Sequence, residues 1–361
     1  MQKERESSFE LLRILCITGI IFMHTFGPLN DSLTGFNQGV SLFLNALFNT
    51  GVTCFILLSG YFGIRFDLAK LIRLDLVIIF YTVLGTLLSG AFTAKSLLLS
   101  FIPVLSGRYW FLTCYFALCF LSVFLNKLVE KTKKETLAAI LLVFIFLFSF
   151  IPTFFFYELI ADSGKGIVQM VIAYLLGAYL KKYHTEHFSR IRLLLLLCGS
   201  TLLIFGFNTV LTMIKGVQMG TFARDNSLFI LFSAVMLLLF FREFHFRSRL
   251  VNHLAANVMP LYVFESFVRL FVIDRFFPLG GYTDSRLLIL YVTGYVLLTV
   301  ILCMACNELR RLTFVHLDNL IARLCMKLYH ALAPAAQRFC KRLCGGMLQF
   351  LTATNTDAAT K

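Results

Sequence analysis

The chain has 361 residues, of which 59% are hydrophobic and 14% charged, and its mean hydropathy is +0.83. Soluble domains are about 45–50% apolar and about 25% charged, so this composition excludes a soluble enzyme domain and indicates an integral membrane protein. A net charge of +14 would suggest nucleic-acid binding in a soluble protein, but in a membrane protein it must first be compared with the topology.

Apolar segments with few charges recur along the chain and predict an all-α polytopic membrane protein, a bundle of about ten transmembrane helices. A span needs about 20 apolar residues, and on that basis we place spans at residues 11–29, 42–63, 71–92, 109–126, 136–155, 164–181, 191–213, 226–241, 256–277 and 287–306. The apolar segments 38–50 and 95–106 are too short to cross, so we expect re-entrant or interfacial helices there.

Lysine and arginine residues alternate between the two sides of these spans. The side that holds both termini carries 25 of them, the opposite side carries 7, and Arg269 lies within the ninth span. Because basic residues are enriched in cytoplasmic loops, this distribution predicts that both termini are cytoplasmic. The net charge is therefore a topological signal, and we expect no nucleic-acid partner.

The first apolar segment is preceded by a flank as acidic as it is basic and lacks a small-residue cleavage site, so we expect it to be retained. Residues 1–306 then form one transmembrane domain, and residues 307–361 form a cytoplasmic tail. In the tail, leucines recur at helical spacing from Leu309 to Leu328, among Arg310, Arg311, Arg323 and Lys327. This pattern predicts a basic amphipathic helix that lies on anionic membrane lipids.

The first span contains two polar side chains that are costly in a membrane, Arg13 and His24, and such groups are functional candidates by default. They are eleven residues apart, which at 100° per residue is about three turns plus 20°. We therefore expect both side chains to face one cavity. Their axial separation of about 16 Å means that they would act on different parts of one extended ligand.

The segment ELLRILCITGIIFMHTF at residues 10–26 resembles the first helix of the membrane acyltransferase-3 family, in which an arginine and a histidine are separated by ten residues. Further segments resemble the family's later motifs: FILLSGYFG at 55–63, GRYWFLTCYFALCFLSVFLN at 107–126, DNSLFILFSAVMLLLFF and NHLAANVMPLYVFE. The resemblance covers almost the whole chain in the same order. It implies a bacterial inner-membrane O-acyltransferase that moves an acyl group, most often acetyl, from cytoplasmic acyl-CoA to a hydroxyl of a surface or lipid-linked glycan.

Carried over by position, His24 matches the family's essential histidine, Arg13 its arginine, and Tyr109 with Trp110 the start of its fourth-helix motif. The chain departs from the family at two positions. Glu265 follows Tyr-Val-Phe where members often have a histidine, and Thr53 stands where many members have an acidic residue.

We hypothesise that His24 is a general base that accepts the proton of the acceptor hydroxyl, because a neutral imidazole can do so near neutral pH. Arg13 would hold the phosphates of coenzyme A at the cytoplasmic mouth, oriented by Glu10 three residues earlier. A covalent acyl-histidine route stays open as an alternative. No bound cofactor is expected beyond acyl-CoA as a donor substrate.

Further candidates for the donor or substrate cavity are Glu10, Ser59, Tyr61, Tyr109, Trp110, Asn226 and Glu265. Several of them also have purely structural interpretations. Ser59 and Tyr61 fit helix packing and the membrane interface, and Trp110 fits an aromatic belt. Asn226 fits a helix cap, and Glu265 fits an ion pair with Arg269 four residues later.

The remaining cysteines and histidines are interpreted as structural, and no metal site is expected. Cys303 and Cys306 form a C-x-x-C pattern without a second ligand pair. His184 and His187 lie in a basic loop without an evident carboxylate cluster, so we expect solvated histidines.

Two other function classes stay open. A transporter or flippase for a glycan or lipid would also have many spans, although neither paired repeats nor broken helices in both halves are evident. A non-catalytic membrane sensor or structural subunit is the third class, and the intact pair of Arg13 and His24 argues against it.

Overall fold

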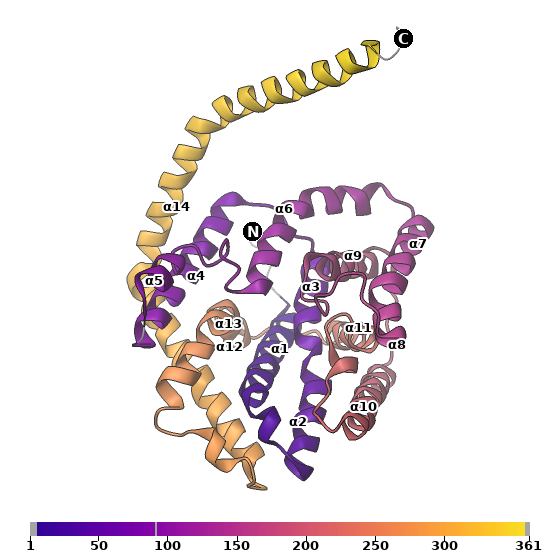
Figure 1. Cartoon of the computed structure of the whole chain (residues 1–361), viewed down its shortest axis with the longest axis vertical. Helices are drawn as coiled ribbons and strands as arrows, with labels where there is room; N and C mark the ends of the chain where they lie inside the picture. Colours follow the sequence, from indigo (N-terminus) through magenta and orange to yellow (C-terminus); the bar gives the residue numbers. More distant parts are fainter. Residues whose placement is uncertain (1–5, 91, 358–361) are drawn as a thin grey trace. The chain divides into compact units, whose positions relative to one another are not determined.

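The computed structural model describes residues 6–90 and 92–357, with the side chains of residues 335–357 left out of the description. Every regular element in this part of the chain is a helix, which confirms the all-α expectation (Figure 1). The residue contacts divide the chain into two units. The larger one runs to Phe66 and resumes at Val77–Leu309, and the smaller one comprises Asp67–Leu76 and the chain from Arg310 onward.

The larger unit contains most of the helices. They are α1 (Ser7–Phe26), α2 (Gly35–Phe48), α3 (Thr50–Phe62), α5 (Ala94–Leu99), α6 (Trp110–Lys131), α7 (Lys134–Ile145), α8 (Ile151–Phe155), α9 (Ile167–Tyr183), α10 (Arg190–Lys215), α11 (Leu228–Arg242), α12 (Arg249–Ala255) and α13 (Val258–Phe267). Short π-helices follow α7 and α13, at Phe146–Phe150 and Val268–Ile273. Two helices have residues in both units, α4 (Leu68–Leu88) and α14 (Leu288–Asp357).

Seven helices in the described ranges are long and apolar enough to cross a membrane, or eight if the bent pair Arg249–Ala255 and Val258–Ile273 is one span. A helix occurs at each of the ten predicted positions, but α9 has 17 residues and α11 has 15. At 1.5 Å per residue, α11 is about 22 Å long, less than a hydrocarbon core of roughly 30 Å. The membrane-protein class is therefore supported, whereas the count of ten is not confirmed and the orientation of the termini stays a prediction.

One expectation for the short apolar segments is wrong. Residues 38–50 do not form a separate re-entrant helix, because α2 and α3 follow each other as a single 28-residue apolar stretch, Gly35–Phe62. The segment 95–106 does contain only a short helix, α5, which is followed by turns.

The tail residues predicted to be helical belong to α14, which continues without interruption from Leu288 to Asp357. Within the smaller unit, Arg310 Nη2 contacts the Asp318 carboxylate at 2.9 Å. The lipid contact of the tail and a domain boundary after residue 306 stay predictions.

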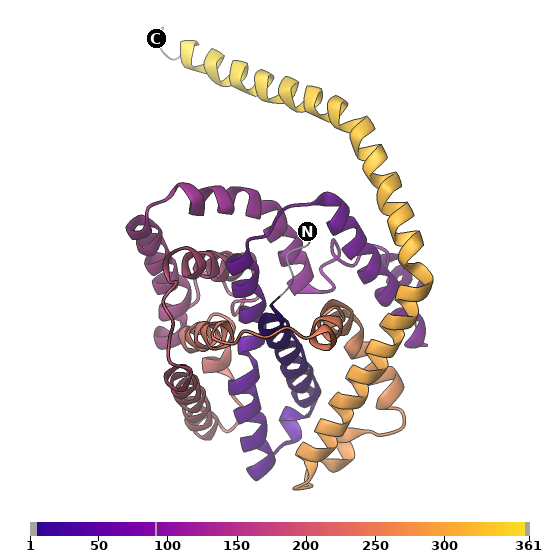
Figure 2. The same cartoon turned by 180° about the vertical axis from the view of Figure 1, so that it is seen from behind.

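Helix α1 lies among α2, α3, α11, α12 and α13 (Figure 1). Figure 2 shows the segment between α11 and α12 crossing one end of α1, where the Ser7 amide donates to the Phe246 carbonyl at 3.2 Å. This contact holds the start of α1 next to the start of α12. The first helix is thus positioned by elements from both halves of the chain.

Helices α3 and α9 approach each other through glycines. A Cβ on Gly60 would lie 1.9 Å from the Tyr174 carbonyl oxygen, and one on Gly177 would lie 2.1 Å from the Leu57 carbonyl oxygen. Neither position can accept a side chain without moving backbone. The Ser-Gly-Tyr motif therefore has a packing role at Gly60, as small residues commonly do between membrane helices.

Candidate active site

A cavity of about 250 Å³ lies along one face of α1. Arg13, Ile17 and Ile20 line it from α1, spaced so that they form a single stripe. The other walls come from α3, α6 and the α12–α13 region, and consist of Val52, Phe55, Ser59, Phe111, Tyr115, Ala255, Ala256, Val258, Met259 and Tyr262. The cavity is thus mostly apolar, and Arg13 is the one cationic side chain in its lining. Small-molecule sites usually combine an apolar wall with a few polar groups in this way.

His24 continues the stripe of α1 one turn beyond Ile20, but it is not among the residues that line the cavity. Its Nδ1 contacts Glu265 Oε1 at 2.8 Å, and the other oxygen of that carboxylate accepts from Arg269 Nε at 3.1 Å. The side chains of Glu265 and Arg269 are buried, whereas that of His24 is 44% exposed. The ion pair between Glu265 and Arg269 confirms the interpretation made from their spacing.

This arrangement determines which imidazole nitrogen is free. The Arg269 guanidinium stabilises the ionised form of Glu265. An ionised carboxylate can only accept a hydrogen bond, so Nδ1 of His24 is the donor. No hydrogen bond to Nε2 is found among the described residues, so its lone pair is then available. The Arg269 carbonyl also accepts from the Tyr295 hydroxyl at 2.7 Å, which fixes this part of the π-helical segment.

Arg13 lies at the other end of the stripe, and its Nη1 donates to Glu10 Oε1 at 2.6 Å. Glu10 is buried, and the Arg13 side chain is 30% exposed and lines the cavity. The predicted contact between these two residues is therefore present. It leaves the remaining guanidinium nitrogens available toward the cavity.

The other residues predicted from the sequence to line the cavity lie in different environments. Ser59 lines the cavity, with its hydroxyl bonded to the Phe55 carbonyl at 2.8 Å. Tyr109 does not line it, but its hydroxyl donates to the Val263 carbonyl at 3.2 Å and so holds α13 two residues before Glu265. Tyr61 is buried against Phe9, away from the cavity lining.

Trp110 and Asn226 do not line the larger cavity, and each lines a smaller one of about 10 Å³. The cap interpretation of Asn226 is wrong, because the N-cap residue of α11 is Ser227. Trp110 begins α6, one residue before Phe111, which does line the larger cavity.

Sequence analysis missed several aromatic residues of the cavity wall, above all Tyr115 and Tyr262. Their helical spacing could have indicated that they belong to the site. Tyr115 lies four residues after Phe111 on α6, and Tyr262 lies three residues before Glu265 on α13, so each shares a helix face with a neighbour in or beside the site.

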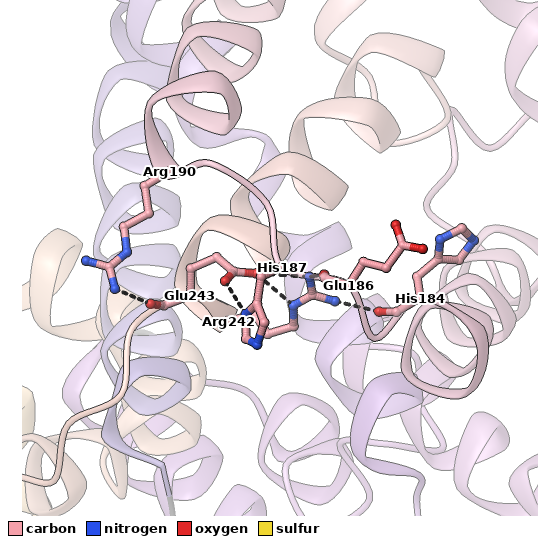
Figure 3. A network of polar contacts seen from close by, with 6 residues as sticks. All are labelled: His184, Glu186, His187, Arg190, Arg242 and Glu243. Atoms are coloured by element: carbon pink, nitrogen blue, oxygen red, sulfur yellow. Dashed lines mark hydrogen bonds and ion pairs between the residues drawn. The ribbon is translucent and has the colours of Figure 1, made fainter.

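A second polar network lies in the loops between α9 and α10 and after α11 (Figure 3). The buried Glu243 carboxylate contacts His187 Nδ1 at 2.7 Å and Arg242 Nη2 at 2.9 Å, and the Glu243 carbonyl accepts from Arg190. Burial alone would raise the pKa of Glu243, but the hydrogen bonds from His187 and Arg242 outweigh it and lower that pKa. His187 is exposed, as expected, but it has a carboxylate partner that the sequence did not indicate.

Among the described residues, no three His, Cys, Asp or Glu side chains are grouped so that they could hold a metal ion.

A family model described as an acyltransferase domain, Acyl_transf_3, matches residues 6–308. This range includes the cavity, the histidine–carboxylate pair and the second polar network. A search among curated proteins and one among solved structures each found no match.

Proposed function

From the premise that this chain belongs to the acyltransferase-3 family, whose model spans residues 6–308, we propose a specific reaction for this membrane acyltransferase. It moves an acyl group, with acetyl as the first choice, from acyl-CoA to a hydroxyl of a cell-surface or lipid-linked glycan, in a bacterial inner membrane. The observation that carries the proposal is the contact between His24 and Glu265 at the end of the stripe that starts at Arg13.

In the proposed reaction, Nε2 of His24 accepts the proton of the acceptor hydroxyl as its oxygen attacks the thioester carbonyl. The carbon–sulfur bond breaks, an ester forms, and the proton passes from the imidazolium to the leaving thiolate to give free coenzyme A. Glu265 stabilises the transient imidazolium, and Arg269 keeps Glu265 ionised. General-base assistance of this kind contributes about 10²- to 10⁴-fold in rate.

The donor would occupy the length of the cavity. With the start of α1 in the cytoplasm, Arg13 is placed to bind a phosphate of coenzyme A, since a guanidinium matches phosphate oxygens. The pantetheine arm would then follow the apolar wall at Ile17 and Ile20 toward His24. The roughly 16 Å between Arg13 and His24 suits an extended donor of this type.

The proposal is tested with His24→Ala in membranes that contain the full chain. Coenzyme A release from acetyl-CoA and the mass of the cell's surface glycans are measured together. His245→Ala is the matched control, because His245 is an exposed histidine in a loop. Normal glycan acylation in His24→Ala at normal protein abundance would overturn the proposed mechanism.

The same preparation separates a transferase from a transporter. A transferase consumes acyl-CoA, and coenzyme A should protect the purified protein from modification of Arg13 by a dicarbonyl reagent. A glycan transporter would move saccharide across vesicles without releasing coenzyme A.

A further inference from the structure

A small void adjoins the main cavity. It has a volume of about 10 Å³, and Trp110, Thr53, Gln169 and Asp225 are among the residues that line it. Val52 lines both this void and the 250 Å³ cavity, so the two are neighbours at that side chain. The void has room for about one hydroxyl oxygen or water molecule, and none for a sugar ring.

Asp225 is a buried carboxylate without the partners that such a group usually has. It is 4% exposed, and no Lys, Arg or His nitrogen is within 4.0 Å of it in the described ranges. The only hydrogen bond to its carboxylate from the described residues comes from Asn49 Nδ2, at a long 3.4 Å. Burial, with a smaller contribution from Asp162 and opposed by Lys165, raises its pKa to about 7.

Gln169 adds a second acceptor beside it. Its Nε2 donates to the Asp225 carbonyl at 3.1 Å, while its Oε1 is buried and has no hydrogen-bond partner among the described residues. The loop that carries Gly164 closes over this pair, since a Cβ on Gly164 would lie 2.3 Å from the Asn226 amide nitrogen. A buried acceptor without a donor, such as Gln169 Oε1, is costly unless a donor enters the void, and the Asp225 carboxylate beside it has only the long hydrogen bond from Asn49.

The residues that line the void indicate which kind of ligand would supply the hydrogen-bond donor. A sugar presents hydroxyl groups, which donate hydrogen bonds, on an apolar ring of C–H groups, which pack against aromatic side chains. Trp110 forms one wall of the void, and its ring is 6.0 Å from that of Phe111, which lines the larger cavity. We expect a ring held on the Val52 and Phe111 side to direct one hydroxyl toward these acceptors.

We propose that Trp110, Gln169 and Asp225 form the subsite that binds hydroxyl groups of the acceptor saccharide. This inference rests on the proposed function, because it assigns the acceptor side of that reaction. Asp225 binds and positions the acceptor, and His24 remains the base.

Trp110 is the only tryptophan in the chain, so its fluorescence reports on this subsite alone. The test titrates the full chain in lipid nanodiscs with the methyl glycosides of glucose, galactose, N-acetylglucosamine and rhamnose. We expect at least one glycoside to give a saturable fluorescence change. In Asp225→Ala and Gln169→Leu, the half-saturating concentration should rise about tenfold or more, because a buried polar partner is lost.

Asp284→Asn is the control variant, because Asp284 is an exposed carboxylate in another loop, and it should titrate like the parent chain. If Asp225→Ala does not fold, the isosteric Asp225→Asn takes its place and should weaken binding by a smaller factor. The absence of a fluorescence change with every glycoside, as expected for a void that holds only water, would overturn the proposal. Equal titrations of the Asp225 variants and the parent would do the same.

The titration needs no acyl donor and no turnover. It can therefore succeed when His24→Ala retains acylation, and fail when His24→Ala loses it. The failure of the subsite and the failure of the proposed reaction are thus distinguishable.

Discussion

Two sets of the same three residue types occur in this molecule. His24, Glu265 and Arg269 are linked at 2.8 and 3.1 Å within the helices, and His187, Glu243 and Arg242 are linked at 2.7 and 2.9 Å in the loops. In both sets a buried glutamate joins Nδ1 of a histidine to a guanidinium. The bond geometry therefore does not distinguish a reacting group from a structural one.

The surroundings distinguish them. Arg242 also donates to the His184 carbonyl at 2.6 Å, and Arg190 donates to the Glu243 carbonyl (Figure 3). These arginines thus bind backbone carbonyls in the α9–α10 loop and in the segment after α11. His24 instead extends the stripe of α1 that lines the cavity. Similar side-chain chemistry thus ties loops together in one place and lies at the end of the cavity stripe in the other.

The largest expected difference is between the two histidines. His24→Ala should lower acyl transfer by about 10²- to 10⁴-fold because it removes the base, whereas His187→Ala should change it less than about twofold. Acyl transfer by purified proteins at matched abundance checks this. Equal losses in both variants would mean that the loop set takes part in the reaction.

A smaller effect is expected when each glutamate is replaced by its amide. Glu265→Gln should lower the rate about 10- to 100-fold, since the neutral amide neither fixes the imidazole tautomer nor stabilises its cation. Glu243→Gln should leave the rate near that of the parent. The comparison uses rates at saturating donor, and an unchanged rate in Glu265→Gln would remove that residue from the proposed mechanism.

The loop set should be visible in stability instead. Arg242→Ala removes one donor from the Glu243 carboxylate, which keeps His187, and also removes the Arg242 donor of the His184 carbonyl, so we expect a loss of about 1–3 kcal/mol in the free energy of unfolding. Thermal unfolding in detergent measures it. Arg249→Ala, which changes an exposed arginine at the start of α12, is the control.

The smallest effects concern the dependence of stability on pH. Glu243 and Asp225 should change the free energy of unfolding in opposite directions as the pH rises. The pKa of Glu243 is lowered in the folded chain, so its contribution to stability is present above about pH 4.5 and is lost as the pH falls below that value. The pKa of Asp225 is raised from 3.8 to about 7, so the folded chain binds the extra proton between these values and stability falls as pH rises toward 7.

Unfolding midpoints measured from pH 4 to pH 8 separate the two contributions. Glu243→Gln should flatten the profile at its acidic end, and Asp225→Asn should flatten it between about pH 5 and 7. Identical profiles for Asp225→Asn and the parent would contradict the assignment of a protonated Asp225.

Local patterns determined much of the candidate site. Helical spacing placed Arg13 on the stripe that lines the cavity, and the spacing of Glu10 to Arg13 and of Glu265 to Arg269 led to contacts that are present. Such predictions succeed because residues three or four apart on a helix are neighbours whatever the rest of the chain does.

The sequence by itself also determined the membrane class and the helical content, since apolar composition and segment length follow from the chain alone. It did not determine that His24 contacts Glu265, 241 positions away, nor that Gln169 lies against Asp225. Those contacts depend on which helix faces pack together, as at Gly60 and Gly177. Packing between distant segments is set by the shapes of both partners, and no local spacing records it.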